Sequence, residues 1–302
     1  MAPLQHAPDR VAPQAGRLTD NLVARLDHLG TLRFSGTDAE IFLQGQLTCD
    51  VAGIRPNSSS YGAYCSPKGR MLASFILWRD DQGFAMVLSR ELAVTMHKHI
   101  SRFVLRSKVK IEDTSDSTAL VGAIGVPEKR LPAFPFLRLK DGRLLLALPA
   151  GTVSEALRGL PVADAALWRW LDIRNGLPLV TAATRDQFVP QMANLELIGG
   201  VSFDKGCYTG QEIVARAQHL GQVKRRMFLA NALAAVQAGD ALYSDDLAGQ
   251  AAGTVMNAEA SPEGGCDLLA IVQIASRERS TVRLGAPDGP ALRFLPLPYG
   301  VA

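Results

Sequence analysis

The most reactive group of residue types in this sequence lies in the segment 199–212, GGVSFDKGCYTGQE. Cys207 offers a thiol, which becomes nucleophilic, oxidisable and able to bind metal when it loses its proton. Lys205, two residues earlier, adds positive charge that favours the thiolate. Gly206 and Gly210 let the backbone turn tightly or approach a ligand closely. We therefore take Cys207 as the candidate reactive residue.

The residues after this thiol predict the start of a helix. Thr209 and Glu212 fit a capping box, in which both side chains bond to free backbone amides at the helix start. Cys207 would then lie two residues before the helix cap, near unpaired amides and the positive end of the helix dipole. A purely structural explanation stays open, because capping boxes and glycines are common at helix starts and a lone cysteine is often a small buried apolar residue.

The remaining metal-binding residue types do not form a ligand set. His97 and His99 are two residues apart, so on a helix they point to different faces, and we expect surface histidines that do not share a metal. Cys49, Cys65 and Cys266 form no CxxC pair. We assign no metal site, and we expect free thiols in a reducing compartment. The first residues have no apolar stretch typical of a secretory signal, so we expect a cytoplasmic protein.

The elements that must position these residues alternate between hairpins and helices. Apolar residues at helical spacing predict a helix over 91–104, and Thr37 with Glu40 predicts a second capping box before another helix. Strands are expected at 32–36, 61–64, 71–78, 84–88, 109–112, 119–124 and 142–148, and further helices at 153–158 and 163–173. This order indicates an α+β fold, followed after Arg226 by a β-rich region with strands at 268–274 and 281–284.

Composition excludes several classes of protein. The chain has 302 residues, enough for about two or three domains, and its 47% hydrophobic content is that of a packed protein. No apolar run approaches the length of a membrane span, so no membrane partner is expected. The net charge of +3 is too small to indicate direct nucleic-acid binding. A basic cluster at 216–226 could steer an anionic ligand, but such clusters are more often solvated surface.

The string KGCYTGQE, Lys205 to Glu212, resembles the signature of the YgfZ family of folate-binding proteins, which are related to the T-protein (aminomethyltransferase) of the glycine cleavage system. Collinear segments extend the resemblance over nearly the whole chain, from about Leu22 to Tyr299. They are LQGQLTCDV at 43–51, CSPKGR at 65–70, FVPQ at 188–191, Asn194-Leu195, and LPY at 297–299.

The resemblance implies a fold of three lobes around a central channel. It implies a discontinuous core domain at 1–50 and 111–221, a ferredoxin-like α+β domain at 51–110, and a C-terminal β-barrel domain at 222–302. The α+β order followed by a β-rich end agrees with this at low resolution.

The resemblance also implies that tetrahydrofolate binds in the channel and that the protein supports iron–sulfur cluster assembly or repair in client proteins, tRNA-modifying enzymes among them. Cys207 would be the key thiol, supported by the motif residues Lys205, Gly206, Tyr208, Gly210, Gln211 and Glu212. Whether Cys207 holds a transient cluster, reduces a damaged centre or exchanges thiols stays open.

Three residues take the family's folate-contact positions. Trp168 could stack on the pterin, although its helical spacing fits a core residue equally well. Leu29 stands where the family has a second tryptophan, so that stacking contact is missing. Arg174 stands where the T-protein branch has a pterin-anchoring glutamate, and the stretch 89–96 offers no aspartate. A folate-dependent one-carbon transferase is therefore the alternative function, with its expected carboxylates lacking.

Overall fold

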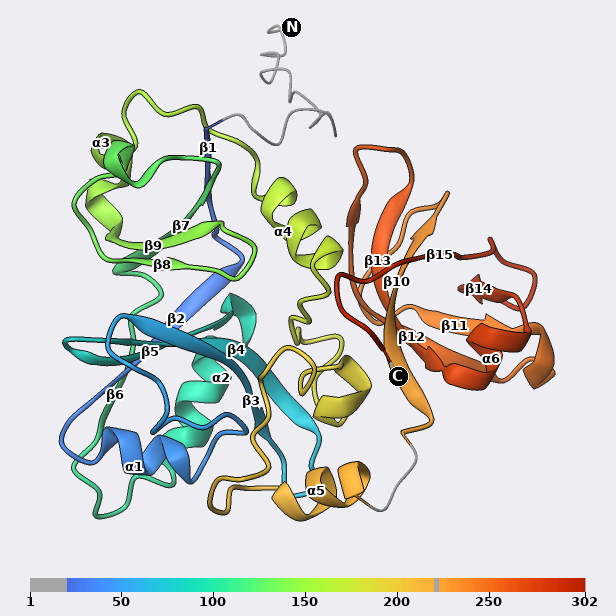
Figure 1. Ribbon diagram of the computed structural model, residues 1–302, viewed down its shortest axis with the longest axis horizontal. Helices are drawn as coiled ribbons and strands as arrows, with labels where there is room; N and C mark the ends of the chain where they lie inside the picture. The colour runs from blue at the N-terminus through green and yellow to red at the C-terminus, as the bar shows by residue number, and fades with distance from the viewer. Residues whose placement is uncertain (1–20, 220–222, 302) are drawn as a thin grey trace, which may run out of the picture.

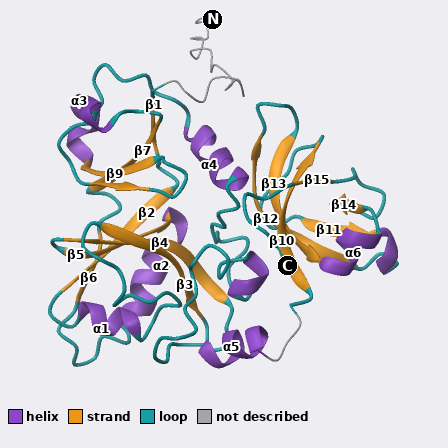
Figure 2. Cartoon of the chain, viewed as in Figure 1, coloured by secondary structure: helices purple, strands orange, loops and turns teal. Residues whose placement is uncertain are grey.

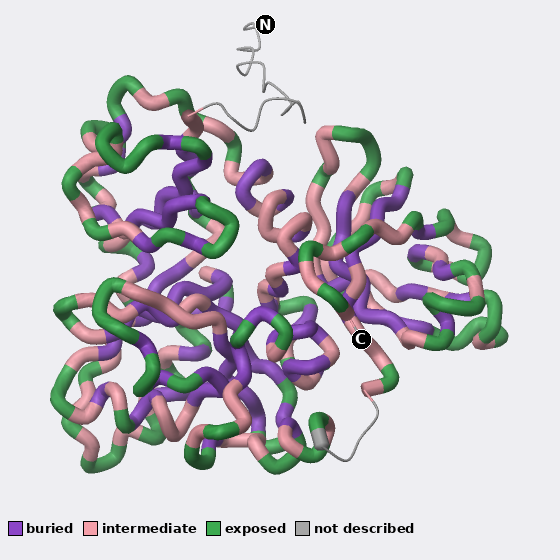
Figure 3. Tube along the Cα trace, in the orientation of Figure 1, coloured by how far each residue is buried: buried purple, intermediate pink, exposed green. Residues whose placement is uncertain are grey.

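The computed structural model describes residues 21–219 and 223–301, which form three lobes (Figure 1). Residues 1–20, on which we predicted no secretory signal, lie outside the described residues. Each lobe is built on an antiparallel sheet, and most strands run through the interior of their lobe (Figure 3). The described residues include no helix that is both long and apolar enough to cross a bilayer.

The first lobe is a five-stranded sheet with the order β3-β4-β5-β2-β6. Its elements are β2 (Leu29–Ser35), α1 (Ala39–Gln44), β3 (Ser58–Cys65), β4 (Met71–Asp80), β5 (Gly83–Ser89), α2 (Arg90–Ser101) and β6 (Lys110–Asp113). Helix α2 forms because Leu92, Met96 and Ile100 recur at four-residue spacing and share one buried face. That face packs against β2, β5 and β6, as the predicted helix over 91–104 requires.

The second lobe is a four-stranded sheet with the order β1-β7-β9-β8. Its elements are β1 (Leu22–Arg25), β7 (Thr118–Ile124), β8 (Phe136–Arg138), β9 (Leu144–Pro149), α3 (Val153–Ala156) and α4 (Ala165–Arg174). The carboxylate of Asp164 caps α4 by accepting a hydrogen bond from the amide of Ala166 at 2.8 Å. Helix α4 buries Leu167, Trp168 and Ile173, and it lies between the first two lobes and the third (Figure 1).

The third lobe is a six-stranded sheet with the order β14-β11-β12-β13-β10-β15, curved into a half-barrel. Its elements are β10 (Arg225–Ala232), β11 (Ala241–Ser244), β12 (Ala251–Ala260), β13 (Cys266–Gln273), α6 (Ile274–Arg279), β14 (Val282–Leu284) and β15 (Arg293–Leu295). Buried Asp267 joins this sheet to α4, since its carboxylate accepts from the indole N–H of Trp170 at 2.8 Å and pairs with Arg174 at 3.5 Å.

The chain between α4 and α5 (Gln211–His219) crosses the middle of the molecule largely as loops (Figure 2). The structure places one short 3₁₀ helix in this stretch, at Pro190–Ala193, which packs on β10 and on α5. Other 3₁₀ turns occur at Glu128–Arg130, Ala150–Thr152 and Asp245–Leu247. The signature segment therefore reaches α5 from the centre of the fold, held by contacts to several lobes.

The strands that are hydrogen-bonded into one sheet do not follow the predicted domain boundaries. Strand β2, which we placed in the core domain 1–50, pairs with β5 and β6 in the first sheet. The boundaries at 50/51 and 110/111 therefore cut one continuous sheet. The third sheet lies within the predicted range 222–302.

The predicted capping box at Thr37 and Glu40 is wrong. Helix α1 begins at Ala39 after Asp38, without a side-chain cap. Glu40 instead accepts a hydrogen bond from Arg79 at 2.7 Å, because the guanidinium of β4 competes for its carboxylate.

Candidate functional site

Lys205 fastens the signature loop to the end of α1. Its ammonium group donates hydrogen bonds to the carbonyls of Gln44 and Leu47 at 2.6 Å and of Cys49 at 2.9 Å. Three N–H donors thus meet three carbonyl oxygens, one from the last residue of α1 and two from the chain that follows it. Burial lowers the pKa of Lys205 to about 8. We predicted that Lys205 would tune the thiol, and the structure shows it bound to these carbonyls.

Thr48 makes a second attachment between the same two segments. Its hydroxyl donates to the carbonyl of Gly200 at 2.6 Å and accepts from the amide of Ala63 at 2.8 Å. Its carbonyl accepts from the amide of Ser202 at 2.9 Å. The segment 43–51 and the signature, 150 residues apart in sequence, are therefore packed together in the fold.

The turn 66–70 packs against the start of α5. Gly210 has φ +82°, and a Cβ atom there would lie 2.4 Å from the carbonyl oxygen of Ser66 and 2.9 Å from the Cα of Gly69. A Cβ at Gly69 would in turn lie 2.8 Å from Ile213 of α5. Only glycine permits this backbone-to-backbone approach, which explains both glycines without invoking a ligand.

Two buried amides from the 3₁₀ helix region hold α5 and β10, one each. Gln191 donates from Nε2 to the carbonyl of Val214 at 2.7 Å, and Asn194 donates from Nδ2 to the carbonyl of Met227 at 2.7 Å. Arg226 donates to the carbonyl of Gln191 at 2.8 Å and forms an ion pair with Glu196. The motif segments 43–51, 65–70 and 188–191 therefore converge on α5 and on the loop before it.

Cys207 is exposed on this anchored loop, whereas Cys49 and Cys65 are fully buried. Burial raises the pKa of Cys49 to about 11 and of Cys65 to about 12, so both stay protonated and unreactive at neutral pH. Cys266, on β13, is partly exposed. Exposure therefore singles out Cys207 as the thiol that a partner molecule reaches most easily.

The helix after Cys207 starts later than the capping box predicted. Helix α5 begins at Gln211. Within residues 21–219 and 223–301, neither the side chain of Thr209 nor that of Glu212 forms a hydrogen bond to a backbone amide at the helix start. Gly210, with its left-handed φ, occupies the position before the first helical residue. Cys207 is thus one residue farther from the helix than we predicted.

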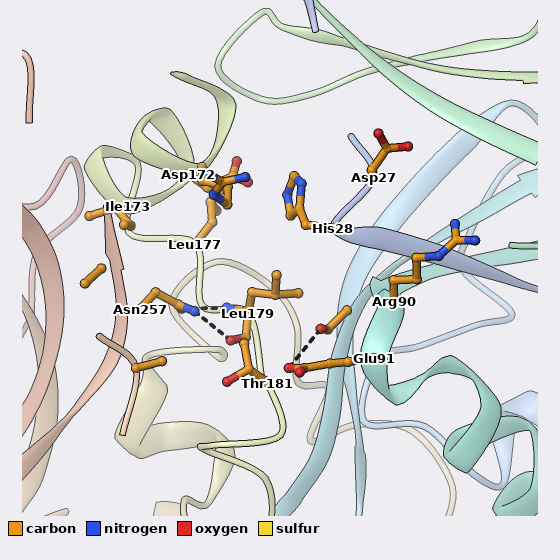
Figure 4. Close-up of a pocket in the computed structure, with 14 residues that line it drawn as sticks. Asp27, His28, Arg90, Glu91, Asp172, Ile173, Leu177, Leu179, Thr181 and Asn257 are labelled. Carbon is orange, nitrogen blue, oxygen red and sulfur yellow. Dashed lines mark hydrogen bonds between the residues drawn. The ribbon is translucent and has the colours of Figure 1, made fainter. Parts of the chain in front are cut away.

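The largest pocket described lies where the three lobes meet, with a volume of about 540 Å³ (Figure 4). Apolar walls come from Ile173, Leu177 and Leu179. Polar groups come from the β1–β2 loop (Asp27 and His28), from the start of α2 (Ser89, Arg90 and Glu91), from α4 (Arg169 and Asp172), and from Thr181 and Asn257. Apolar walls with a few convergent polar groups are typical of a small-molecule site.

A hollow of about 60 Å³ adjoins this pocket and shares Asp172, Leu177 and Leu179 with it. Beyond it, a pocket of about 270 Å³ shares Tyr61 and Leu139 with the hollow and is lined by Gly199 at the start of the signature segment. These cavities follow one another through the middle of the molecule. Cys207 is not among the residues that line any of the three.

Comparison with known proteins decides the family. No protein-family model matches the chain. The chain is 32% identical to the tRNA-modifying protein YgfZ of Klebsiella pneumoniae (strain 342), over 97% of each chain, and 33% identical to that of Enterobacter sp. (strain 638), over 97% of this chain and 98% of the relative. This chain belongs to the YgfZ family. The resemblance found in the signature and its flanks is confirmed.

The fold of this YgfZ-family chain is that of the glycine cleavage T-protein. The crystal structure of the glycine cleavage system aminomethyltransferase T from Bartonella henselae superposes with a TM-score of 0.70, covering 93% of this chain and 87% of that one. The sequence identity is 17%, so the likeness concerns the fold. The predicted α+β, T-protein-like arrangement is thereby confirmed.

The predicted folate-contact residues of this YgfZ-family chain lie away from the main pocket. Trp168 is 2% exposed and, together with Leu29, borders the 60 Å³ hollow, which is too small for a pterin. Arg143 lies 4.1 Å from the centroid of the Trp168 ring, and a Cβ at Gly122 would lie 2.2 Å from that ring. Stacking by Trp168 therefore requires its neighbours to move. Arg174 pairs with Asp267 and lies 5.8 Å from the ring of Trp170.

Sequence reasoning missed most of the pocket's polar residues. We found no aspartate in 89–96, yet Glu91 in that stretch lines the pocket with Asp27 and Asp172. Three carboxylates are therefore present where we expected such groups to be lacking. No local pattern marks these residues, because they come from separate segments. The one signal in the sequence was that ionisable residues of the β1–β2 loop directly precede Leu29, which the resemblance placed at a folate contact.

Proposed function

We propose that this chain binds a reduced folate in the pocket at the junction of its three lobes and supports the assembly or repair of iron–sulfur clusters in client enzymes, tRNA-modifying enzymes among them, with Cys207 as the working thiol. The tRNA-modifying name of its YgfZ relatives supports the link to tRNA modification.

The observation that carries the folate proposal is the pocket itself. Its volume of about 540 Å³ lies within the usual range for a drug-sized ligand, and its walls combine an apolar side with convergent carboxylate, imidazole and amide groups. Glu91, Asp27 and Asp172 suit a ring system rich in N–H donors, and Arg90 suits an anionic tail. When bound, tetrahydrofolate supplies nitrogen atoms that can carry a one-carbon unit.

The position of Cys207 supports a role that depends on another protein. The thiol is exposed and its loop is held by Lys205 and Thr48, so a partner meets a side chain on an ordered backbone. Because Cys207 does not line the pocket, the thiol and the ligand act at separate places. A client protein can therefore approach Cys207 while the pocket is occupied.

Two measurements test this function. Anaerobic calorimetric titration with tetrahydrofolate is expected to show one site, and absence of binding would remove the folate proposal. Cells lacking the native protein are expected to regain the activity of an iron–sulfur, tRNA-modifying enzyme with the wild-type chain but not with Cys207→Ala. Cys266→Ala, a second cysteine away from the signature, is the matched control and should rescue fully. Rescue by Cys207→Ala would remove the thiol proposal.

A folate-dependent one-carbon transferase is the second candidate. It is favoured by the three carboxylates in the pocket, since a carboxylate can bind the aminopyrimidine edge or steer a reactive amine. Its test is transfer of the methylene carbon from an aminomethyl thioether to tetrahydrofolate, with release of ammonia and the free thiol, by the wild-type chain compared with Glu91→Gln. Transfer that Glu91→Gln abolishes would favour this alternative over cluster maintenance.

The cysteine content supports a cytoplasmic location. All four cysteines are free, and Cys49 and Cys65 are buried with no disulfide. Unpaired thiols persist where the compartment is reducing. We infer no membrane partner and no direct nucleic-acid contact, and we propose the folate and client proteins as partners.

A further inference from the structure

His28 stands out in the wall of the large pocket. It lies on the loop between β1 and β2, and its backbone carbonyl accepts a hydrogen bond from the amide of Arg90 at 2.9 Å, which fixes the loop against α2. Both ring nitrogens, Nδ1 and Nε2, are buried and have no hydrogen-bond partner within the described residues. Buried polar atoms in folded proteins almost always have partners, so an imidazole with none needs an explanation.

The other ionisable side chains of the pocket already have partners. Each forms an ion pair or a hydrogen bond within the protein, in the pairs Asp27–Arg25, Arg90–Asp116, Glu91–Ala182 amide, Arg169–Glu259 and Asp172–Arg143. Asn257 likewise exchanges hydrogen bonds with the backbone of Leu179 (Figure 4). His28 is thus the ionisable residue of this lining whose hydrogen-bonding capacity is unused in the described structure.

The surroundings of His28 keep the ring uncharged. Burial, together with the smaller effect of the charge of Arg169, lowers the pKa of His28 to about 4, although Asp27 opposes the shift. Of the other charged groups of the lining, Arg90 and Asp172 are in ion pairs, and Glu91 accepts a hydrogen bond from the amide of Ala182. An uncharged imidazole carries one N–H donor and one nitrogen acceptor. It therefore suits an uncharged polar group of a ligand.

We propose that His28 is a ligand-binding residue of this pocket, and that its imidazole turns from the wall toward the bound molecule to hydrogen-bond an uncharged polar atom of a heterocyclic ring. Figure 4 shows His28 beside the pocket, between Asp172 of α4 and Asp27. A change of side-chain rotamer would bring a ring nitrogen to the ligand and give that nitrogen the partner it lacks. The identity of the ligand rests on the proposed function.

The test uses the full chain and 5-formyltetrahydrofolate as the probe. His28→Leu keeps the apolar volume but removes both nitrogens, and we expect its dissociation constant to rise about tenfold. His28→Gln retains a donor and an acceptor, and its affinity should lie between those of His28→Leu and the wild type. His97→Gln is the matched control, because His97 lies on α2 outside the pocket lining and bonds to the carbonyl of Ile111. Its affinity should equal that of the wild type.

A second measurement separates ligand binding from a merely structural role. Without ligand, His28→Leu should unfold at the same temperature as the wild type or higher, because it removes two unpartnered buried atoms. A lower midpoint together with unchanged affinity would overturn the proposal, as would unchanged affinity in both His28 variants. These outcomes leave folate binding by the wild type intact. Failure of the wild type itself to bind the probe would overturn the proposed function and this inference together.

Discussion

The guanidinium of Arg143 lies over the ring of Trp168, 4.1 Å from its centroid, and is held there by Asp141 and Asp172 at 2.6 Å each. Arg143 is 5% exposed in its side chain and also donates to the carbonyl of Trp168. The ring that we predicted as a possible stacking surface is therefore already covered by a cation. This arrangement joins α4 to the hairpin turn between β8 and β9.

Arg143→Ala should lower the free energy of unfolding by about 3–5 kcal/mol, because it leaves two carboxylates without their cation. Arg138→Ala is the matched control: Arg138 forms an exposed ion pair with Glu128, and its loss should cost less than about 1 kcal/mol. Urea unfolding of both variants measures the difference. Equal effects would show that the buried pair adds no more than the exposed one.

The two glycines around Cys207 should respond differently to alanine. Gly210→Ala forces a side chain into a left-handed backbone 2.4 Å from the carbonyl of Ser66, so we expect a loss of about 2–4 kcal/mol and displacement of the turn 66–70. Gly206→Ala meets no atom within 4 Å, and its effect should stay within about 0.5 kcal/mol. Thermal or urea unfolding of the two variants decides this, and a tolerated Gly210→Ala would contradict the packing described.

The four thiols should react in a fixed order. With iodoacetamide at neutral pH, Cys207 should be labelled first and Cys266 more slowly, because of their exposure. Cys49 and Cys65 should remain unlabelled until the protein unfolds, since burial raises the pKa of each. Peptide mass spectrometry at successive times measures the order. Early labelling of Cys49 would show that the first lobe opens readily.

His28 should make stability depend on pH. Its pKa is about 4 in the folded chain and about 6.5 when exposed, so between these values the unfolded chain binds a proton that the folded chain does not. The free energy of unfolding should therefore fall as pH falls from 6.5 to 4, by up to about 3 kcal/mol from this residue. Above pH 6.5 both states are neutral and the effect is absent.

The variant His28→Leu isolates that contribution from the carboxylates that titrate in the same range. The difference in unfolding free energy between the variant and the wild type should widen in favour of the variant as pH falls from 7 to 4.5. Urea unfolding at several pH values measures it. A difference that stays constant with pH would mean that His28 is protonated as easily in the folded chain as in the unfolded one.

Much of the fold was predictable because local patterns determine it. The four-residue spacing of Leu92, Met96 and Ile100 predicted α2, and apolar runs predicted β4, β5 and β7 to within a few residues. The strands β10, β11 and β12 were not predicted one by one, since β10 and β12 contain alanine and asparagine, residue types that are depleted in strands. The capping box at Thr37 and Glu40 failed because a tertiary contact, the pairing of Glu40 with Arg79, redirected the side chain.

The candidate site was predictable in part. The signature and its flanking segments pointed to the loop of Cys207, and the structure packs the segments 43–51, 65–70 and 188–191 against α5 or the loop before it. The pocket was not predictable, because residues such as His28, Glu91, Asp172 and Asn257 come together only when three lobes assemble. Tertiary contact also explains Lys205, whose three carbonyl acceptors no spacing along the chain could reveal.

The attachment of Lys205 to the end of α1 has a consequence for the affinity of a protein that binds at the sulfur atom. Docking partners usually lose affinity when a flexible segment must be ordered at the moment of contact. Here the conformational entropy of the segment around Cys207 is already lost when the chain folds, so a binding partner does not have to order that segment. Without the hydrogen bonds of Lys205, the segment that carries this sulfur would be flexible, and a partner would have to order it on binding.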